Sequence, residues 1–368
     1  MPSALSETLY FDARYIRIGH HDGISRFTVG LITALHRRVD LVVLVHDQRQ
    51  LEKLPVGIKY ELMTDPTSIR EFLIPKKLNK LGAKLVYSPM QTMGTLGRRY
   101  KVVLTLHDLI YYRHPKPPPS LPWFIRVGWR LFHLSYFPQR LVLNGADAIV
   151  TVSETTKALI GKTRLTRKPV HVVYNAAGNL AGDYQHAMPK HRPQRPFQLV
   201  YMGSFMDYKN VELLISAMRG LNDYQLHLLS PITADRKREL QRFFSSYQII
   251  FHDGVSESVY HQILDSAYAL VSASKDEGFG IPLVEAMARG IPVVVSDIEI
   301  FREIGAGAAI YFDASDASDF VKKVRSLESD QQWLQRSRLS YQQASNFGWD
   351  KSASALIRAL RSVIEPES

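Results

Sequence analysis

The sequence of 368 residues contains no cysteine. Disulfide bonds and cysteine-ligated metal sites are therefore excluded. Long apolar runs are also missing, because no stretch approaches the roughly 20 residues of a membrane-spanning helix. The first residues lack the basic segment and apolar core of a signal peptide. We therefore expect a cytoplasmic protein, either free in the cytosol or peripheral on the inner face of the cell membrane.

Acidic residues are scarce in the first half of the chain. Residues 1–195 carry 29 Lys and Arg against 13 Asp and Glu, a net charge of +16, whereas residues 196–368 carry −5. This asymmetry indicates that one domain meets lipid headgroups or nucleic acid, unless it is only a basic, soluble face. Residues 123–137 mix large apolar rings with Arg126 and Arg130, which is typical of a membrane-surface helix but also fits packing inside the domain.

The segment over residues 267–297 has the clearest pattern in the chain. Residues 268–273 and 291–296 are short apolar runs of the kind that buried parallel strands need. Between them, Pro282 suits the first position of a helix, and Gly290 suits the left-handed residue that ends one. The pattern predicts a strand, a glycine loop, a helix over residues 282–289 and a second strand.

The loop before this helix has the composition of a phosphate site. Gly278, Phe279 and Gly280 lie at the start of the predicted helix, where glycines let a ligand approach and free N–H groups face it. Glu277 and Glu285 can flank the same pocket. Since carboxylates repel phosphate, we assign both to hydroxyl groups, and phosphate with hydroxyls indicates a sugar nucleotide. The alternative, glycines that only turn the chain beside solvated glutamates, leaves the agreement of the whole segment unexplained.

The run Glu277-Gly-Phe-Gly-Ile-Pro-Leu-Val-Glu285 resembles the Glu-x7-Glu signature of the retaining GT-B glycosyltransferases, family 4, also called glycosyl transferases group 1. The resemblance implies an α/β fold of two Rossmann-like doubly wound domains that face a cleft. Residues 1–190 would form the acceptor-side domain and residues 196–345 the donor-binding domain, with a linker over residues 178–196. Residues 346–368 would form a helix that crosses back to the first domain.

The resemblance also gives roles to residues of the donor-binding domain. Lys209-Asn210 is similar to the Lys-Asn pair whose lysine contacts the donor diphosphate, together with the amides of Gly278, Phe279 and Gly280. A cation there would stabilise the departing diphosphate. Glu285 would bind the donor ribose and Glu277 the donor sugar. A lysine at a helix start is otherwise an ordinary surface residue.

Three residues of the first domain are further candidates. His107 follows the predicted strand over residues 101–106, at the end of a parallel strand where open α/β sheets bind ligands. Its His-Asp-Leu context resembles the family motif near the donor sugar, so His107 would hold that sugar, although a structural histidine is the alternative. Gly23 and Arg26 resemble the Gly-Ile-Gly-Arg cleft loop, with Ser25 replacing the second glycine. Without the resemblance they are a turn residue and a surface charge.

We therefore expect a metal-independent enzyme without cofactor that moves a sugar, with retention, from a UDP- or GDP-linked donor to a glycan or lipid-linked acceptor. General likeness suggests a mannosyltransferase of cell-envelope polysaccharide that uses GDP-mannose. We also expect contact with an anionic membrane and none with nucleic acid. A nucleotide-sugar epimerase of the same fold and a non-catalytic protein that binds anionic membranes or nucleic acid remain as alternatives.

Overall fold

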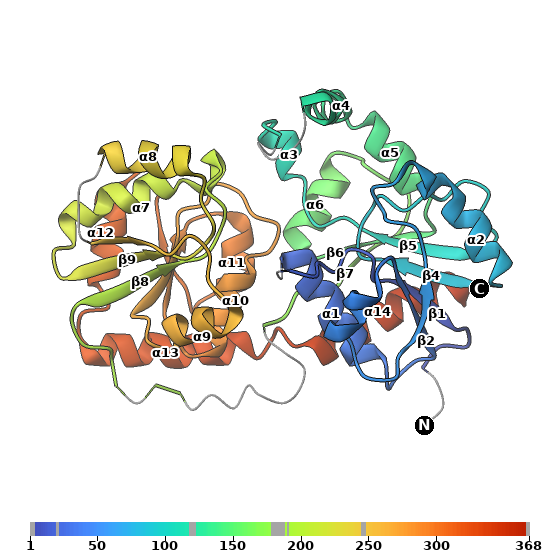
Figure 1. The fold of residues 1–368 in the computed structure, drawn as a ribbon. Coiled ribbons are helices and arrows are strands. Elements are labelled where there is room, and N and C mark those ends of the chain that lie inside the picture. The colour runs from blue at the N-terminus through green and yellow to red at the C-terminus, as the bar shows by residue number, and fades with distance from the viewer. Residues whose placement is uncertain are drawn as a thin grey trace. The chain divides into compact units, whose positions relative to one another are not determined.

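The computed structural model describes residues 4–19, 22–117, 123–177, 188–189, 191–243 and 248–365. The chain forms two compact units, Met1–Ala181 with Gly348–Ser368, and Gly182–Phe347. Each unit contains one sheet with helices packed around it (Figure 1). Most of the predicted linker, residues 178–187 and 190, lies outside the described residues.

The first unit is built on a seven-stranded parallel sheet in the order β3-β2-β1-β4-β5-β6-β7. Its strands are β1 (Leu9–Asp12), β2 (Leu41–Val45), β3 (Lys59–Leu62), β4 (Leu85–Ser88), β5 (Lys101–Thr105), β6 (Ala148–Thr151) and β7 (Val170–Val172). Its helices are α1 (Gly23–Leu35), α2 (Ile74–Lys80), α3 (Ile110–Arg113), α4 (Trp123–His133), α5 (Phe137–Asn144), α6 (Glu154–Lys162) and α14 (Trp349–Ile364), with 3-10 turns η1 (Gln48–Lys53) and η2 (Ile69–Leu73).

The second unit has a six-stranded parallel sheet in the order β10-β9-β8-β11-β12-β13. The strands are β8 (Phe197–Tyr201), β9 (Tyr224–Leu228), β10 (Ile249–Phe251), β11 (Ala269–Ser272), β12 (Val293–Ser296) and β13 (Ile310–Phe312). The helices are α7 (Val211–Ala217), α8 (Ala234–Phe243), α9 (Glu257–Asp265), α10 (Ile281–Ala288), α11 (Glu299–Gly305), α12 (Ala317–Arg325) and α13 (Asp330–Ala344), with 3-10 turns η3 (Asp207–Lys209) and η4 (Met218–Gly220).

Both sheets confirm the predicted doubly wound α/β class. Strands β4 and β12 are buried along their whole length, as expected for apolar runs covered on both faces. In each sheet the strand order reverses once, between β1 and β4 and between β8 and β11. Open α/β sheets bind ligands beyond the carboxyl ends of the strands at such a point. The loops after these strands therefore hold the candidate site residues of each unit.

Helix α14, at the end of the chain, packs on the first unit. A side chain at Gly30 of α1 would overlap the Trp349 ring, which lies 6.3 Å from the Phe27 ring, centroid to centroid. The Ser352 hydroxyl donates to the Tyr174 carbonyl at 2.7 Å. Trp349 is buried, so it acts as a packing residue. Among the helices that the structure describes, none has both the length and the apolar character needed to cross a bilayer.

Candidate functional site

The glycine loop of the second unit connects β11 to α10. Helix α10 begins at Ile281, one residue before the predicted start, and Gly290 has the left-handed φ of +68° expected after a helix end. Gly280 precedes the helix with a φ of +94°, a conformation that side chains disfavour. As the N-cap residue, Gly280 has no side chain that could cap the first amides of α10. This end of the helix therefore presents backbone donors and the positive end of the helix dipole.

Lys209 and Glu277 meet beside this loop. The Lys209 ammonium forms an ion pair with the Glu277 carboxylate, and the two side chains are only 12% and 16% exposed. The Lys275 amide donates to the Tyr208 carbonyl at 2.7 Å, which fastens the glycine loop to η3. The sequence predicted both residues for one site, and the structure brings them into direct contact. A ligand phosphate would compete with Glu277 for the lysine.

Two serines that the sequence analysis missed hold the Glu277 carboxylate in place. The Ser274 hydroxyl donates to Glu277 Oε1 at 3.0 Å, and Ser274 is fully buried. Ser296, at the end of the neighbouring strand β12, donates to the Ser274 carbonyl. The only sequence signal for these contacts is that each serine stands at the carboxyl end of a buried strand. Glu277 is thus oriented by two neighbouring strand ends.

Glu285 is buried inside the second unit. It is the fifth residue of α10, in the second turn of the helix, and is only 3% exposed. The buried Tyr260 hydroxyl, from α9, donates to Glu285 Oε2 at 2.7 Å. A buried carboxylate is retained where hydrogen bonds satisfy it. Tyr260 was not among the predicted site residues, and it fixes the Glu285 rotamer.

In the first unit, His107 follows β5 and is partly buried. Its Nε2 lies 2.8 Å from the Pro89 carbonyl oxygen, which can only accept, so Nε2 carries the proton and Nδ1 is left as an acceptor. The Phe27 ring packs edge-on at 5.2 Å between centroids. Burial lowers the pKa of His107 below the ordinary histidine value, which favours this neutral form at pH 7. Its neighbour Asp108 accepts from the Ile110 amide at 3.0 Å and thereby orients the loop.

The predicted cleft-loop residues lie at the start of α1. Gly23 is the first residue of the helix, Arg26 is partly exposed, and the Asp22 carboxylate caps the helix by accepting from the Ser25 amide at 2.8 Å. The contacts of Ser25 explain why this chain has a serine where the family motif has a glycine. The buried Ser25 hydroxyl accepts from the Arg17 amide at 3.0 Å and so ties the preceding loop to the helix.

A buried ion network in the first unit was not predicted. Arg14 donates to both oxygens of Asp12, at 2.8 and 3.0 Å, and to both oxygens of Glu71, at 3.0 and 2.7 Å. The Ser88 hydroxyl donates to Asp12 at 3.1 Å. Burial disfavours the charge on Arg14, but Asp12 and Glu71 together raise the pKa of its guanidinium above the ordinary value. The network stabilises the carboxyl ends of β1 and β4.

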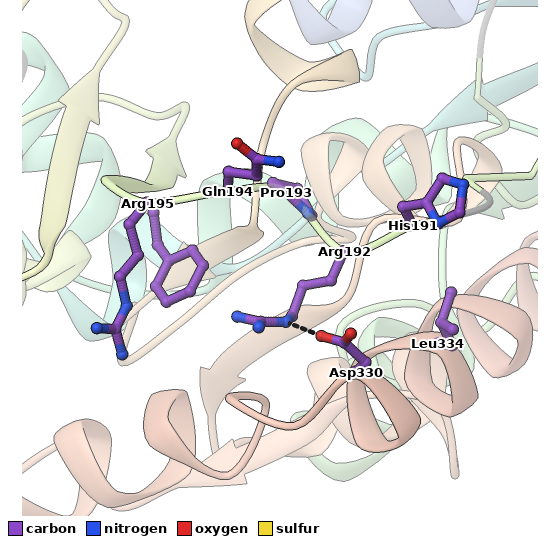
Figure 2. A pocket seen from close by; sticks show the side chains of 8 residues that line it. His191, Arg192, Pro193, Gln194, Arg195, Asp330 and Leu334 are labelled. Carbon is purple, nitrogen blue, oxygen red and sulfur yellow. Dashed lines mark hydrogen bonds and ion pairs between the residues drawn. The ribbon is translucent and has the colours of Figure 1, made fainter.

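The second unit also has an open pocket away from the glycine loop. Its volume is about 640 Å³, and residues 191–195 line it together with Asp330 and Leu334 (Figure 2). Figure 2 shows the Arg192 guanidinium against the Asp330 carboxylate, with the nitrogen and oxygen 2.6 Å apart. Arg195 pairs with Asp223 at 3.0 Å. Because both arginines face acids, the pocket offers no unbalanced charge to an anion.

Within the described ranges, no group of three His, Cys, Asp or Glu side chains could hold a metal ion. The predicted independence from metal stays a prediction.

Sequence comparisons identify the family of each unit. The family described as Glycosyltransferase Family 4 matches residues 21–177, and Glycosyl transferases group 1 matches residues 185–345. Together the two matches cover most of the chain, and each falls largely within one structural unit.

Several related proteins are mannosyltransferases. An O-antigen chain mannosyltransferase of Salmonella typhimurium is 29% identical over 251 residues, which are 67% of this chain and 65% of the relative. O-antigen chain mannosyltransferase B of Escherichia coli is 23% identical over 72% of this chain and 71% of its own. A serotype-specific mannosyltransferase of Escherichia coli is 30% identical over 117 residues, only 31% of this chain and 14% of the relative. The chain thus matches less than two thirds of some of these relatives.

Solved structures establish the fold. Sucrose-phosphate synthase from Thermosynechococcus elongatus superposes with a TM-score of 0.71 at 16% identity, over 98% of this chain and all of the other. Anabaena HepE, solved in complex with UDP and glucose, superposes with a TM-score of 0.70 at 16% identity, over 97% of this chain and all of the other.

Proposed function

The chain belongs to the group 1 glycosyltransferases of GT-B fold, and on that premise we propose that it transfers a sugar from a nucleotide diphosphate to an acceptor hydroxyl. The observation that carries the proposal is the pairing of Lys209 with Glu277 beside the uncapped start of α10. A cation and backbone amides suit a diphosphate, and a half-buried carboxylate suits sugar hydroxyls.

The diphosphate is both the bound group and the leaving group. As the glycosidic bond breaks, negative charge grows on the departing phosphate oxygen. Lys209 and the amides of residues 278–280 stabilise that charge more strongly in the transition state than in the bound donor. Displacement of Glu277 from Lys209 by the phosphate frees the carboxylate for a sugar hydroxyl. The buried Glu285 receives the ribose.

The sugar is held by Glu277 and by His107, whose neutral Nδ1 accepts a hydrogen bond from a hydroxyl. We propose that transfer proceeds with retention at the anomeric carbon and without a metal. No side chain acts as nucleophile. The acceptor oxygen forms the new bond on the face that the diphosphate leaves, and the departing phosphate takes the acceptor proton.

The mannosyltransferases among the relatives support mannose as the sugar, and we propose GDP as its carrier. The complexes of HepE with UDP and glucose and with UDP-glucose support a nucleotide-sugar donor in general. The acceptor in this proposal is a glycan or lipid-linked glycan of a cell-envelope polysaccharide. Residues Gly23 and Arg26 belong to the acceptor side, and the enzyme works as a cytoplasmic protein at the surface of an anionic membrane.

The proposal is tested with the full chain and a panel of UDP- and GDP-linked sugars. One donor at a hundred times its dissociation constant raises the free energy of unfolding by about 2.7 kcal/mol. That donor is then incubated with mannose-containing oligosaccharides, and the product linkage is determined by NMR. A product with the anomeric configuration of the donor supports the proposal. Turnover of the donor to an epimer without any acceptor identifies an epimerase instead, and no stabilisation by any nucleotide sugar contradicts donor binding altogether.

A further inference from the structure

Helix α4 of the first unit presents an apolar stripe to solvent. Trp123, Val127 and Leu131 lie four residues apart on the helix, and Leu134 follows one residue after its end. This spacing puts all four on one side. Their exposed fractions are 76%, 48%, 62% and 78%. Exposed apolar residues are common singly, but four on one face mark an interaction surface.

The opposite side of α4 holds the helix on the unit. The Trp129 ring packs edge-on against Tyr111 of α3 at 5.0 Å between centroids. The His133 ring lies 4.9 Å from the Tyr112 ring, centroid to centroid, and its Nδ1 donates to the Trp129 carbonyl at 2.8 Å. The stripe is therefore not the side by which α4 packs on the unit, because the helix contacts α3 through its other side. Figure 1 shows α3, α4 and α5 as consecutive short helices of this unit.

A cationic pocket lies at the far end of α5. It has a volume of about 1040 Å³, and Arg140, Arg164, Arg167 and Lys168 line it. Within the described part of the chain, no Asp or Glu pairs with these four side chains. Arg140 is anchored by donating to the Thr163 carbonyl at 2.8 Å. This pocket differs from the one in Figure 2, whose arginines face acids.

Helix α5 joins the stripe to the pocket. Phe137 and Leu141 are each 63% exposed and share the side of α5 that carries Arg140. No acidic residue occurs between Asp108 and Asp147, so the whole α3–α5 region is free of negative charge. We take the exposed apolar residues of these two consecutive helices together with the cationic pocket that α5 helps to line as one candidate surface, and we call it the α4–α5 surface. Its apolar residues are Trp123, Val127, Leu131, Leu134, Phe137 and Leu141.

We propose that the α4–α5 surface docks on a membrane of anionic phospholipids, with the stripe among the acyl chains and lipid phosphates in the cationic pocket. Aromatic and leucine side chains beside arginines suit the headgroup boundary of a bilayer. Basic side chains near an anionic leaflet add attraction that the stripe alone lacks. A protein partner would need acids to match the pocket, and a nucleic acid would leave the stripe in water. This inference rests on the membrane contact named in the proposed function and assigns that contact to particular residues. Vesicle binding needs no donor, so a failure to bind vesicles is distinguishable from a failure of sugar transfer.

Vesicle flotation with the full chain tests the proposal. The probes are vesicles of phosphatidylcholine alone and of phosphatidylcholine mixed with phosphatidylglycerol. We expect flotation with the mixed vesicles, weaker flotation with phosphatidylcholine, and loss of the difference at high salt, where surface charges are screened. Equal recovery with both vesicle types, or none with either, contradicts the proposal.

Two variants separate the apolar and ionic contributions. The pair Leu131→Ser with Leu134→Ser removes exposed apolar area and lowers affinity for mixed vesicles by roughly tenfold. The triple change Arg164→Gln, Arg167→Gln and Lys168→Gln lowers it by about fivefold for each charge lost. All five side chains lie at the surface, so folding, followed by circular dichroism, stays unchanged.

The matched controls lie elsewhere on the first unit. Val56→Ser with Leu96→Ser removes two highly exposed apolar residues, and Lys76→Gln, Lys80→Gln and Arg99→Gln removes three exposed charges. If the controls weaken vesicle binding as much as the surface variants, the α4–α5 surface is not the docking site. If the wild-type chain self-associates through the stripe and leaves vesicles unbound, a second copy covers it and the proposal is wrong.

Tryptophan fluorescence gives a local readout. Of the four tryptophans, Trp333 and Trp349 are buried, Trp129 packs against α3, and Trp123 is exposed. Docking moves Trp123 from water into the headgroup zone, so emission shifts to the blue when mixed vesicles are added. In Trp123→Phe the shift disappears while flotation persists. A shift that persists in Trp123→Phe contradicts the assigned orientation.

Discussion

The Oε1 atom of Glu277 is contacted by both the Lys209 ammonium and the Ser274 hydroxyl. In the proposed reaction the donor phosphate takes over Lys209, and Glu277 turns its charge to the sugar. The Glu277→Gln substitution keeps the shape of the side chain but removes its negative charge. We expect turnover to fall by about a hundredfold or more, in line with the loss of one transition-state contact.

Steady-state rates with saturating donor measure this loss. The control is Glu257→Gln, because Glu257 is an exposed glutamate in the first turn of α9 and its rate stays at the wild-type value. Unchanged turnover in Glu277→Gln would remove Glu277 from the site.

Arg14 is the residue on which the first unit's buried charges depend. Arg14→Met leaves Asp12 and the partly buried Glu71 without their cation. Loss of one partner of a buried pair costs about 3–5 kcal/mol in the free energy of unfolding. Urea denaturation measures the loss.

The matched exposed pair is Arg49 with Asp47, where Arg49 is 65% exposed. Arg49→Met is expected to leave the urea midpoint almost unchanged, because solvent screens an exposed ion pair. If the two variants unfold alike, the Arg14 network does not carry the stability assigned to it.

At the residue scale the sequence named the candidates but not their partners. The two motifs predicted Lys209, Glu277 and Glu285, because residue types and their spacing can be taken directly from the sequence. The contact of Arg14 with Glu71 joins residues 57 positions apart, and the contact of Tyr260 with Glu285 joins different helices. No local sequence pattern predicts such pairs, because the fold of the whole unit decides which distant side chains come into contact.

The start of α10 is the element on which the proposed donor site depends. Gly280 has a φ of +94°, and a Cβ there would lie 3.1 Å from the Phe301 ring. Gly280→Ala is therefore expected to lower the free energy of unfolding by about 1–3 kcal/mol, through backbone strain. The same substitution is expected to change the orientation of the first backbone amides of α10 and thereby to weaken donor binding.

Thermal unfolding and donor titration measure the two effects. Gly307→Ala is the control, because nothing lies within 4 Å of a Cβ built there. A Gly280→Ala protein that matches Gly307→Ala in both measurements would mean that the loop conformation is not needed.

Strand and helix identities were predicted better than their ends. The predicted strand over residues 268–273 is shorter in the structure, where it covers Ala269–Ser272. Strand β1 stops at Asp12, because the chain turns there to form the Arg14 network, although buried residues follow it. An apolar run in a sequence indicates burial. Because a buried turn after a strand can be as apolar as the strand, the run does not show where the strand ends.

At the scale of the whole chain, the last helix completes the first unit. The buried Trp349 ring fills the space above Gly30, which lies 319 positions earlier in the sequence, so this contact joins the last helix of the chain to the first one.

 Trp349→Ala removes a large buried ring and lowers the free energy of unfolding by about 3–5 kcal/mol. Urea denaturation followed by circular dichroism measures the loss.

The matched control is Trp123→Ala, because Trp123 is 76% exposed. Surface substitutions of this kind change stability by about 0.5 kcal/mol or less. Equal stability of the two variants would show that α14 does not brace the first unit.

The resemblance to the GT-B family implied two α/β domains, and the apolar runs in residues 267–297 predicted two of the parallel strands, because such strands are near-continuous apolar runs. The charge asymmetry predicted a basic first half, and the structure gathers part of that charge in the pocket beside α5. The sequence could not show that α5 lines this pocket, since Arg140 and residues 163–164 meet only in the folded unit.

The central claim is that Lys209 and the start of α10 bind the donor diphosphate. Isothermal titration with GDP and GMP, on the wild type and on Lys209→Met, tests it most directly, with the exposed Lys322→Met as control. We predict that the wild type and the control prefer GDP, and that Lys209→Met loses about 10- to 100-fold in GDP affinity while GMP binding changes little. An undiminished preference for GDP in Lys209→Met would contradict the account.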